Sequence, residues 1–208
     1  MKYIKKFESS IKKMILIGEN LTELPELPGT LKKLICSDNK LTSLSNLPNT
    51  LTEIYCNNNK LIEISKFPEF LTDFACSYNN LKTLPDLPNS LKELFCNSNK
   101  LMKLPNLPDK LKILTCDYNN LNELPILPKK LTLLSCSGNN LEKLPELPDG
   151  LLDLYCYNNN LKELPILPIT LKLLACSGNN LPYTNLKEYD EWLEINHPDI
   201  FMTRKFNI

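Results

Sequence analysis

The chain has 208 residues, of which 42% are hydrophobic and 23% are charged, and both values are ordinary for a soluble globular protein. Its 24 Lys and Arg residues balance its 24 Asp and Glu residues, so there is no excess of positive charge to hold a phosphate backbone. No apolar run approaches the roughly 18 residues of a membrane span. We therefore expect neither a nucleic acid nor a membrane as the partner.

Residues 1–20 carry regularly spaced apolar side chains. Their spacing fits a strand-containing coil and also fits an amphipathic helix, so a short helix before Lys12 is an alternative. We expect a strand at residues 13–17 in both cases. The segment is lysine-rich, but its apolar run at residues 14–17 is shorter than the roughly 7 to 15 residues of a secretion signal, so we expect no general export signal. The apolar residues are Ile4, Phe7, Ile11, Met14 and Leu16.

From residue 21 to residue 180 the sequence repeats with a period of 20. One column holds all eight cysteines, Cys36, Cys56, Cys76, Cys96, Cys116, Cys136, Cys156 and Cys176. A second column holds Asn39, Asn59, Asn79, Asn99, Asn119, Asn139, Asn159 and Asn179. A period of this length predicts a solenoid, in which each unit buries its apolar face against its neighbours. Residues 1–20 lack prolines and carry Glu19 at the Asn position, so they are expected to form a degenerate capping coil.

The unit reads L-x-x-L-P-x-L-P-x-x-L-x-x-L-x-C-x-x-N-x, and its second half predicts a strand. In one such unit Leu91, Leu94 and Cys96 are expected to face inward. Glu93 and Phe95 alternate with them and face outward, which is the pattern of a half-buried strand. Stacked units should therefore form a parallel sheet.

The first half of the unit contains two prolines, for example Pro85 and Pro88. Proline removes a backbone donor and fixes φ near that of extended polyproline geometry, so this side is expected to be extended and not helical. The Asn column lies where the chain leaves the strand and turns. A side-chain amide both donates and accepts, so we expect a stacked ladder that satisfies backbone groups of the turns.

After Asn180 the repeat stops. The sequence TNLKEYDEWLEIN predicts a helix with Leu186, Tyr189, Trp192 and Leu193 on one face, which should cover the open end of the core. Three further apolar residues are expected to continue this seal beyond Pro198. They are Ile200, Phe201 and Met202.

The recurrence of L-P-x-L-P together with L-x-x-L-x-C-x-x-N across residues 21–180 resembles the leucine-rich-repeat family. It is most similar to the short 20-residue class of YopM- and IpaH-type bacterial effectors, and similar cysteine-bearing repeats occur in giant viruses of amoebae. The resemblance implies an α/β-type, mostly β, right-handed curved solenoid with a concave parallel sheet that binds protein. We expect residues 1–208 to form a single domain, with a capping coil at 1–20, eight repeats at 21–180 and a helical cap at 181–208.

The cysteine column could suggest disulfides or a metal site. Inward residues of neighbouring parallel strands lie about 4.8 Å apart, whereas disulfides prefer Cβ separations near 3.8 Å, and the sequence has no C-x-x-C pair. We interpret the column as buried, reduced core residues, which suits a cytoplasmic setting.

Catalysis finds little support in the sequence. The single histidine, His197, lies in the C-terminal cap, remote from most of the cysteines, and is expected to be a turn residue. The effectors that the chain resembles often carry a separate ubiquitin-ligase domain, but fewer than thirty residues follow the last repeat, so that activity does not transfer. The five glycines fit turns better than a phosphate loop. We predict no enzyme activity and no cofactor.

The outward strand positions differ from coil to coil. The first outward column is Lys33, Glu53, Asp73, Glu93, Ile113, Leu133, Asp153 and Leu173. The second outward column is Ile35, Tyr55, Ala75, Phe95, Thr115, Ser135, Tyr155 and Ala175. Aromatic side chains on such a face are typical of protein interfaces, although they also stabilise a sheet through cross-strand contacts. The predicted partner-binding residues are Glu53, Tyr55, Asp73, Tyr78, Glu93, Phe95, Ile113, Tyr118, Leu133, Tyr155 and Tyr157.

The leading hypothesis is a non-catalytic module that binds a protein partner through its concave face. We expect a monomer in the cytoplasm, which includes the cytoplasm of an infected host cell. The alternative is a structural component that self-assembles through its open ends or flanks, and an enzyme is the third hypothesis.

Overall fold

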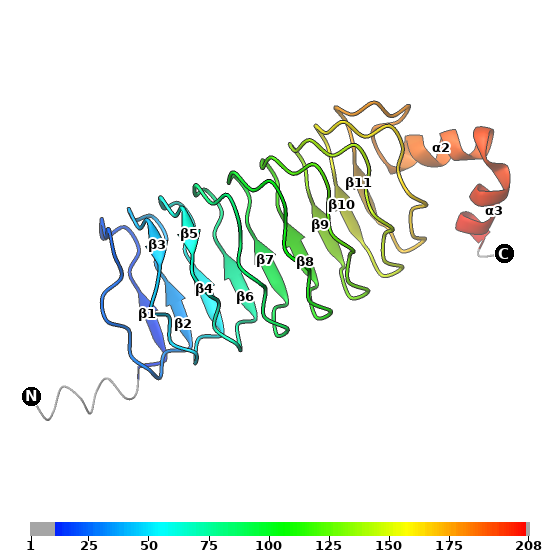
Figure 1. Cartoon of the computed structure of the whole chain (residues 1–208). Coiled ribbons are helices and arrows are strands. Elements are labelled where there is room, and N and C mark those ends of the chain that lie inside the picture. Colours follow the sequence, from blue (N-terminus) through cyan, green and yellow to red (C-terminus); the bar gives the residue numbers. More distant parts are fainter. Residues whose placement is uncertain (1–10, 207–208) are drawn as a thin grey trace, which may run out of the picture.

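The computed structural model describes residues 11–206, and they form a curved solenoid with the two ends of the chain at opposite ends of the molecule (Figure 1). One parallel sheet of nine strands runs along it. In spatial order its strands are β1 (Lys13–Ile15), β2 (Lys33–Ile35), β4 (Glu53–Tyr55), β6 (Asp73–Ala75), β7 (Glu93–Phe95), β8 (Ile113–Thr115), β9 (Leu133–Ser135), β10 (Asp153–Tyr155) and β11 (Leu173–Ala175).

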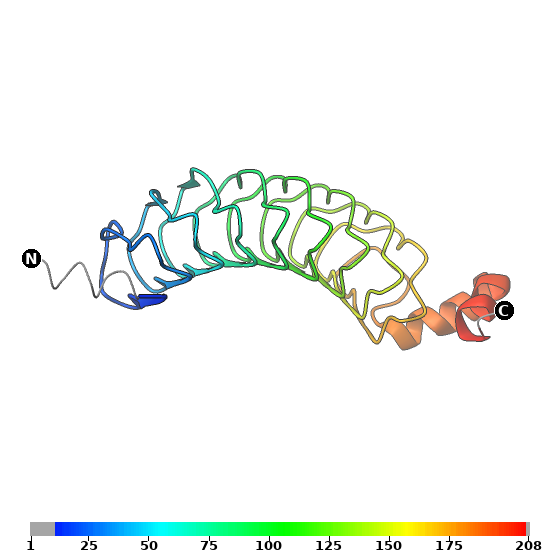
Figure 2. The same cartoon turned by 90° about the horizontal axis from the view of Figure 1, so that it is seen from below.

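The register of this sheet equals the sequence period. Lys33 of β2 pairs with Glu53 of β4, and each later strand pairs with residues 20 positions on. The ladder continues beyond the strands, since the amide of Cys36 donates to the carbonyl of Tyr55 at 2.8 Å. The sheet forms the inner, concave side of the arc (Figure 2), which confirms the predicted fold class.

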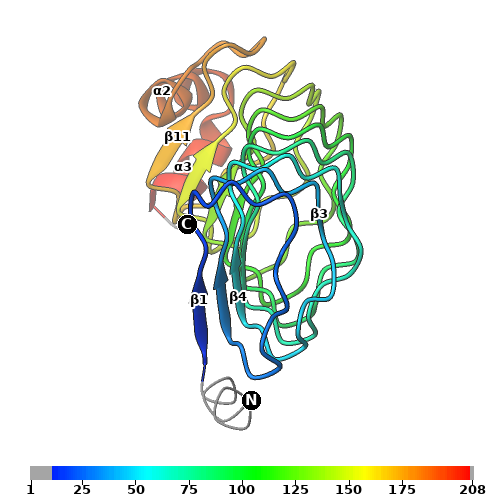
Figure 3. The same ribbon diagram turned by 90° about the vertical axis from the view of Figure 1, so that its left-hand side faces the viewer.

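The core lies between the sheet and the convex side, and the view along the solenoid shows both walls (Figure 3). Leu91, Leu94 and Cys96 are completely buried, while Glu93 and Phe95 are half-buried. The predicted alternation is therefore confirmed. The same columns repeat in every central coil, so the core is one continuous leucine and cysteine stack.

The convex segments of the described coils are extended and contain no helix, as the prolines predict. The sequence analysis did not predict a second, two-stranded sheet formed by β3 (Ser43–Leu44) and β5 (Glu63–Ile64). In these two coils Ser45 and Ser65 stand where the other repeats carry the first proline. Because serine keeps the backbone N–H that proline lacks, these segments can pair.

The predicted asparagine ladder is confirmed. Asn99, for example, donates from Nδ2 to the carbonyls of Cys76 at 3.0 Å and Cys96 at 3.2 Å. Its Oδ1 accepts from the amide of Leu81 at 3.0 Å. Each such side chain bonds to its own coil and to the preceding one, so the ladder joins successive turns.

At the N-terminal end, β1 covers Lys13–Ile15 and is shorter than the predicted strand at 13–17. Ile15 is 55% exposed, because strand pairing exists on one side of β1 within residues 11–206. The alternative helix before Lys12, with Ile4 and Phe7, lies outside the described residues.

At the C-terminal end the predicted helix is α2 (Leu186–Asn196), and a second helix, α3 (Pro198–Phe206), follows it. Asn185 caps α2 by accepting from the amide of Glu188 at 3.1 Å, and the Glu188 carboxylate accepts from the amide of Thr184 at 2.7 Å. This is a reciprocal capping arrangement. No helix among residues 11–206 is long and apolar enough to span a bilayer.

Tyr189, Leu193 and Phe201 are buried, so the predicted sealing role of these residues is confirmed. Met202 is 46% exposed, and the expectation that it continues the seal is wrong. Residues 198–206 form a helix, in which successive side chains point about 100° apart. Ile200 and Phe201 both pack against the core, so Met202, about 200° from Ile200, points away from it.

Candidate functional site on the concave face

The sheet brings most of the predicted partner-binding residues onto one surface. Those on strands are half-buried and lie on the outward side of the main sheet: Glu53, Tyr55, Asp73, Glu93, Phe95, Ile113, Leu133 and Tyr155. Tyr78, Tyr118 and Tyr157 follow their strands and lie where the chain leaves the sheet. The face is preformed, since every strand is held by its neighbours.

Lys33, Glu53 and Tyr55 form a compact polar cluster at the N-terminal end of this face. The Lys33 ammonium is ion-paired with Glu53 Oε2 and lies 4.7 Å from the centre of the Tyr55 ring. The Tyr55 hydroxyl donates to the same Glu53 oxygen at 3.2 Å. The hydrogen bond to Glu53 raises the pKa of Lys33. Glu53, one of the predicted partner-binding residues, is therefore already ion-paired within its own chain.

Asp73 and Glu93 face each other across β6 and β7. Partial burial raises the pKa of Glu93, and the neighbouring Asp73 raises it further. Asp73 accepts a hydrogen bond from Thr72 Oγ1 at 2.5 Å. Two adjacent carboxylates favour the binding of a cation over that of a neutral or negatively charged group.

The acidic character extends further along the face. A third outward column consists of Asn57, Ser77, Asn97, Asp117, Ser137 and Tyr157, of which Ser77 and Ser137 are buried. From residue 53 to residue 157, the three outward columns together contain no Lys or Arg. Their acidic members are Glu53, Asp73, Glu93, Asp117 and Asp153. Because the whole chain is neutral, the positive charges lie mainly on the other surfaces.

The third outward column contains a second ladder that the sequence analysis missed. The amide of Asp117 donates to Asn97 Oδ1 at 2.9 Å, and the amide of Ser137 donates to Asp117 Oδ1 at 2.6 Å. Ser135 Oγ also donates to the Asp117 carboxylate, at 2.7 Å. Burial raises the pKa of Asp117, and these hydrogen bonds oppose the rise. The recurrence of Ser, Asn and Asp at this position was the signal in the sequence.

The tyrosines at the exit from the sheet differ from one another in exposure and contacts. Tyr78 and Tyr118 are 65% and 52% exposed and have φ near +55°, namely 57° and 53°. The Tyr118 ring lies over Gly138, where an added Cβ would come within 2.6 Å of the ring. The hydroxyls of Tyr118 and Tyr157 are 3.2 Å apart, so the Tyr118 side chain crosses the coil that contains Gly138 and reaches the coil beyond it.

The cysteine thiols are all free and buried, as predicted. Burial raises the pKa of Cys36 and Cys176 to about 12, and it also raises the pKa of Cys56. Cys56 Sγ donates to the carbonyl of Ala75 at 3.2 Å. Within residues 11–206 no group of His, Cys, Asp and Glu could hold a metal ion. His197 is exposed and ends α2 as its C-cap.

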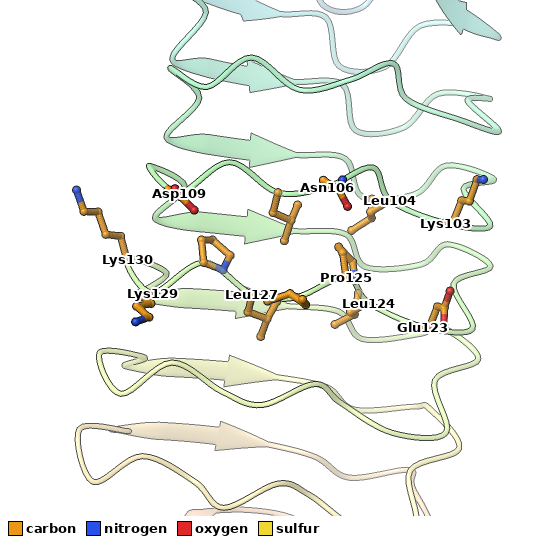
Figure 4. A pocket seen from close by; sticks show the side chains of 13 residues that line it. Lys103, Leu104, Asn106, Asp109, Glu123, Leu124, Pro125, Leu127, Lys129 and Lys130 are labelled. Atoms are coloured by element: carbon orange, nitrogen blue, oxygen red, sulfur yellow. The ribbon is translucent and has the colours of Figure 1, made fainter.

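The convex side offers a rival surface, an open hollow between two coils (Figure 4). Leu104, Leu124 and Leu127 form its floor, with Lys129 and Lys130 at one end and Glu123 toward the other. Ile126, which also lines it, is 88% exposed. Its charges are mixed, in contrast to those of the concave columns.

Comparisons with known proteins agree with this architecture. The sequence matches no protein-family model and no curated protein. Among solved structures, YopM, a leucine-rich effector protein from Yersinia pestis, is similar at a TM-score of 0.76 with 35% identity over 83% of this chain. The chain spans 56% of the length of that YopM chain.

A Shigella effector leucine-rich-repeat domain is similar at a TM-score of 0.67 with 28% identity, covering 94% of this chain and 81% of that domain. The leucine-rich-repeat domain of APL1B shares the fold at a TM-score of 0.57 and 20% identity. The chain is therefore a leucine-rich-repeat solenoid with 20-residue repeats, similar to the repeat domains of bacterial effectors. Leucine-rich-repeat folds generally bind protein partners. The similarity to proteins of giant viruses stays a prediction.

Proposed function

We propose that this chain is a non-catalytic binding module that holds a partner protein on its concave face. The observation that carries the proposal is the composition of that face. Three adjacent outward columns combine carboxylates with aromatic and aliphatic side chains and lack any cation between residues 53 and 157. Such a mixture on a preformed sheet favours association with a basic, partly apolar surface.

The acidic and the aromatic side chains of the face should act at different stages of binding. Asp73 and Glu93 are expected to accelerate association, because charge acts at long range. Tyr55, Phe95 and Tyr155 are expected to prolong the complex, because buried rings supply most of the energy of an interface.

The test begins with proximity labelling in the native host to obtain a partner, followed by binding kinetics with two double variants. Glu53→Lys with Glu93→Lys should slow association and flatten its salt dependence. Tyr55→Ala with Phe95→Ala should speed dissociation by about tenfold or more. The matched control is Ile126→Ser on the convex side, which should bind like the parent. If Ile126→Ser abolishes binding while both concave variants bind normally, the functional surface is convex.

Self-assembly is the second candidate, favoured by two exposed residues at the sheet edge, Ile15 in β1 and Ile17 just after it. Strand edges are templates for pairing with another chain. Size-exclusion chromatography with light scattering separates the two candidates. A monomer up to high protein concentration supports the binding module, and a concentration-dependent assembly supports the structural role.

We further propose that the protein works in a reducing compartment, the cytoplasm of its own cell or of an infected host. The buried thiol column and the similarity to bacterial effectors support this location. The raised thiol pKa values also support a non-catalytic role, because the thiolate is the nucleophile. Fractionation of infected cells with an antibody to the protein tests the location, and recovery from the medium alone would contradict it.

A further inference from the structure

The cluster at Lys33 shows how this face holds a cation. A carboxylate in the first outward column and an aromatic ring two residues later, Glu53 and Tyr55, together surround the ammonium of Lys33. Lys33 reaches them from the preceding coil, where it is the direct register partner of Glu53. We call this combination of a carboxylate and a ring a cation slot. Ion pairing and the ring quadrupole both attract the ammonium there.

The same combination recurs twice farther along the sheet, as Glu93 with Phe95 on β7 and as Asp153 with Tyr155 on β10. All four side chains are half-buried and outward-facing, as are Glu53 and Tyr55. The difference lies in the register partner from the preceding coil.

At these two slots the chain supplies no equivalent of Lys33. The register partner of Glu93 is Asp73, a second carboxylate, and that of Asp153 is Leu133. Within residues 11–206 neither Glu93 nor Asp153 forms an ion pair. Lys112 opposes the rise in the pKa of Glu93 but forms no ion pair with it within residues 11–206.

We propose that these two cation slots, Glu93–Phe95 and Asp153–Tyr155, receive lysine or arginine side chains from an extended basic segment of the partner. This proposal rests on the proposed function and specifies the partner that the concave face fits. At the first slot a second carboxylate, Asp73, adds to the attraction. At the second slot Leu133 and the Tyr155 ring contact the aliphatic stem of the cation.

The spacing of the slots defines the segment. β7 and β10 are three strand steps apart in the sheet, which corresponds to about 14 Å at about 4.8 Å per strand. An extended chain rises about 3.3 Å per residue, so residues four apart are separated by about 13 Å and point to the same side. The residue midway between them also points to the face, over β8 and β9, where it meets Ile113 and Leu133. The segment is therefore cation-x-apolar-x-cation, which reads the same in both directions.

The test uses a fluorescein-labelled peptide, Gly-Ser-Lys-Ser-Leu-Ser-Lys-Ser-Gly, and fluorescence anisotropy at low salt with the full chain. Comparison peptides move the lysines to two residues apart, replace both with glutamate, or replace the central leucine with serine. We expect the parent peptide to bind most tightly. Binding should weaken as salt is raised, because the contacts are ionic.

Variants then locate the slots. Glu93→Gln and Asp153→Asn keep side-chain shape and remove charge, and each should weaken binding about three- to tenfold. Glu163→Gln, on the exposed convex side of a neighbouring repeat, is the matched control and should bind like the parent. Phe95→Leu and Tyr155→Leu should weaken binding with little change in salt dependence. Melting temperatures of all variants establish that the fold is retained.

Three outcomes overturn the proposal: no saturable binding up to millimolar protein, equal affinity for all lysine spacings, or unchanged binding in both charge variants. If a natural partner still loses affinity in the concave double variants above, the proposed function stands and the basic segment is wrong. If the natural partner instead depends on Ile126, the proposed function itself fails.

Discussion

At the scale of single residues, the buried asparagines contribute through hydrogen bonds to two coils at once. Asn99 satisfies the amide of Leu81 and the carbonyls of Cys76 and Cys96, all of which lie at buried positions. Removing the amide would leave these buried backbone groups without their hydrogen-bond partner. Lys100, the next residue, is exposed, and its backbone bond to Leu81 does not depend on its side chain.

We therefore expect Asn99→Ala and Asn119→Ala to lower the free energy of unfolding by about 2 to 3 kcal/mol each. Lys100→Ala is the matched control and should change it by less than about 0.5 kcal/mol. Urea unfolding followed by circular dichroism measures all three. Equal urea midpoints would show that the ladder does not carry stability.

Gly138 is a second position where one atom decides the packing. Its φ of +63° favours glycine, and a Cβ there would overlap the Tyr118 ring. Gly138→Ala should therefore destabilise the protein by about 1 to 3 kcal/mol and displace Tyr118 from Tyr157. In the background of Tyr118→Ala the same change should cost less, because only the backbone strain remains. Identical costs in both backgrounds, measured as a double-mutant cycle, would contradict this contact.

At the scale of elements, one arginine adds hydrogen bonds to the apolar contacts that hold the C-terminal cap on the last coil. Arg204 Nε donates to Asp190 Oδ1 at 3.0 Å, and its Nη1 donates to the carbonyls of Leu167 at 2.8 Å and Pro168 at 2.7 Å. The side chain is 9% exposed. It thereby links α3 to α2 and to the convex segment of residues 167–168.

Arg204→Met should release this link while keeping the apolar stem. We expect faster amide hydrogen exchange in α3, by about tenfold or more, because charged hydrogen bonds contribute about 1.5 to 3 kcal/mol. Exchange in the central strands should not change. Lys187→Met, which removes an exposed ion pair to Glu191, serves as the control. Unchanged protection of α3 in Arg204→Met would mean that apolar contacts alone hold the cap.

At the scale of the whole molecule, the cysteine column is one buried stack of eight thiols. Mass spectrometry after denaturation in acid-quenched alkylating solution should find eight free thiols. In the native state alkylation should be slow at pH 8, because burial raises the thiol pKa values and restricts access. Disulfides in a majority of the cysteines, or rapid native labelling, would contradict this prediction.

The same thiols predict a pH dependence of folding. Their pKa values are raised from an ordinary value of 9.0 in the folded state, so the neutral thiol is favoured there. Below pH 9 the thiols are neutral in the folded and the unfolded chain, and stability is at its full value. Above pH 9 the unfolded chain ionises first, so the free energy of unfolding falls by about 1.4 kcal/mol per pH unit for each buried thiol. Urea midpoints should fall between pH 9 and 10.5. Cys96→Ala should reduce the slope, and a slope that Cys96→Ala leaves unchanged would show that other groups cause the fall.

The sequence by itself determined the repeat architecture, because each coil repeats the same residue types at a fixed spacing. A Leu and Cys column facing inward, prolines on the opposite side and an Asn at the turn leave one way to stack the coils. The predicted strands, core, ladder and first capping helix agree with the structure for this reason. The second sheet also has a signal in the sequence, since Ser45 and Ser65 replace prolines. A missing proline predicts strand pairing only when the adjacent coil is known to lie beside it and to lack its proline as well.

Tertiary structure decided which outward residues are engaged with their own chain. In the sequence Glu53, Glu93 and Asp153 are acids of one outward column, and the period of 20 already gives their neighbours in the adjacent coils. The structure shows which of them is engaged: Lys33 is ion-paired with Glu53, whereas neither Glu93 nor Asp153 forms an ion pair within residues 11–206. Likewise, Asp117 is bound by Ser135 and Ser137 from the next coil. The spacing of residue types along the chain specifies which residues are neighbours, but side-chain reach and burial decide which neighbours form contacts.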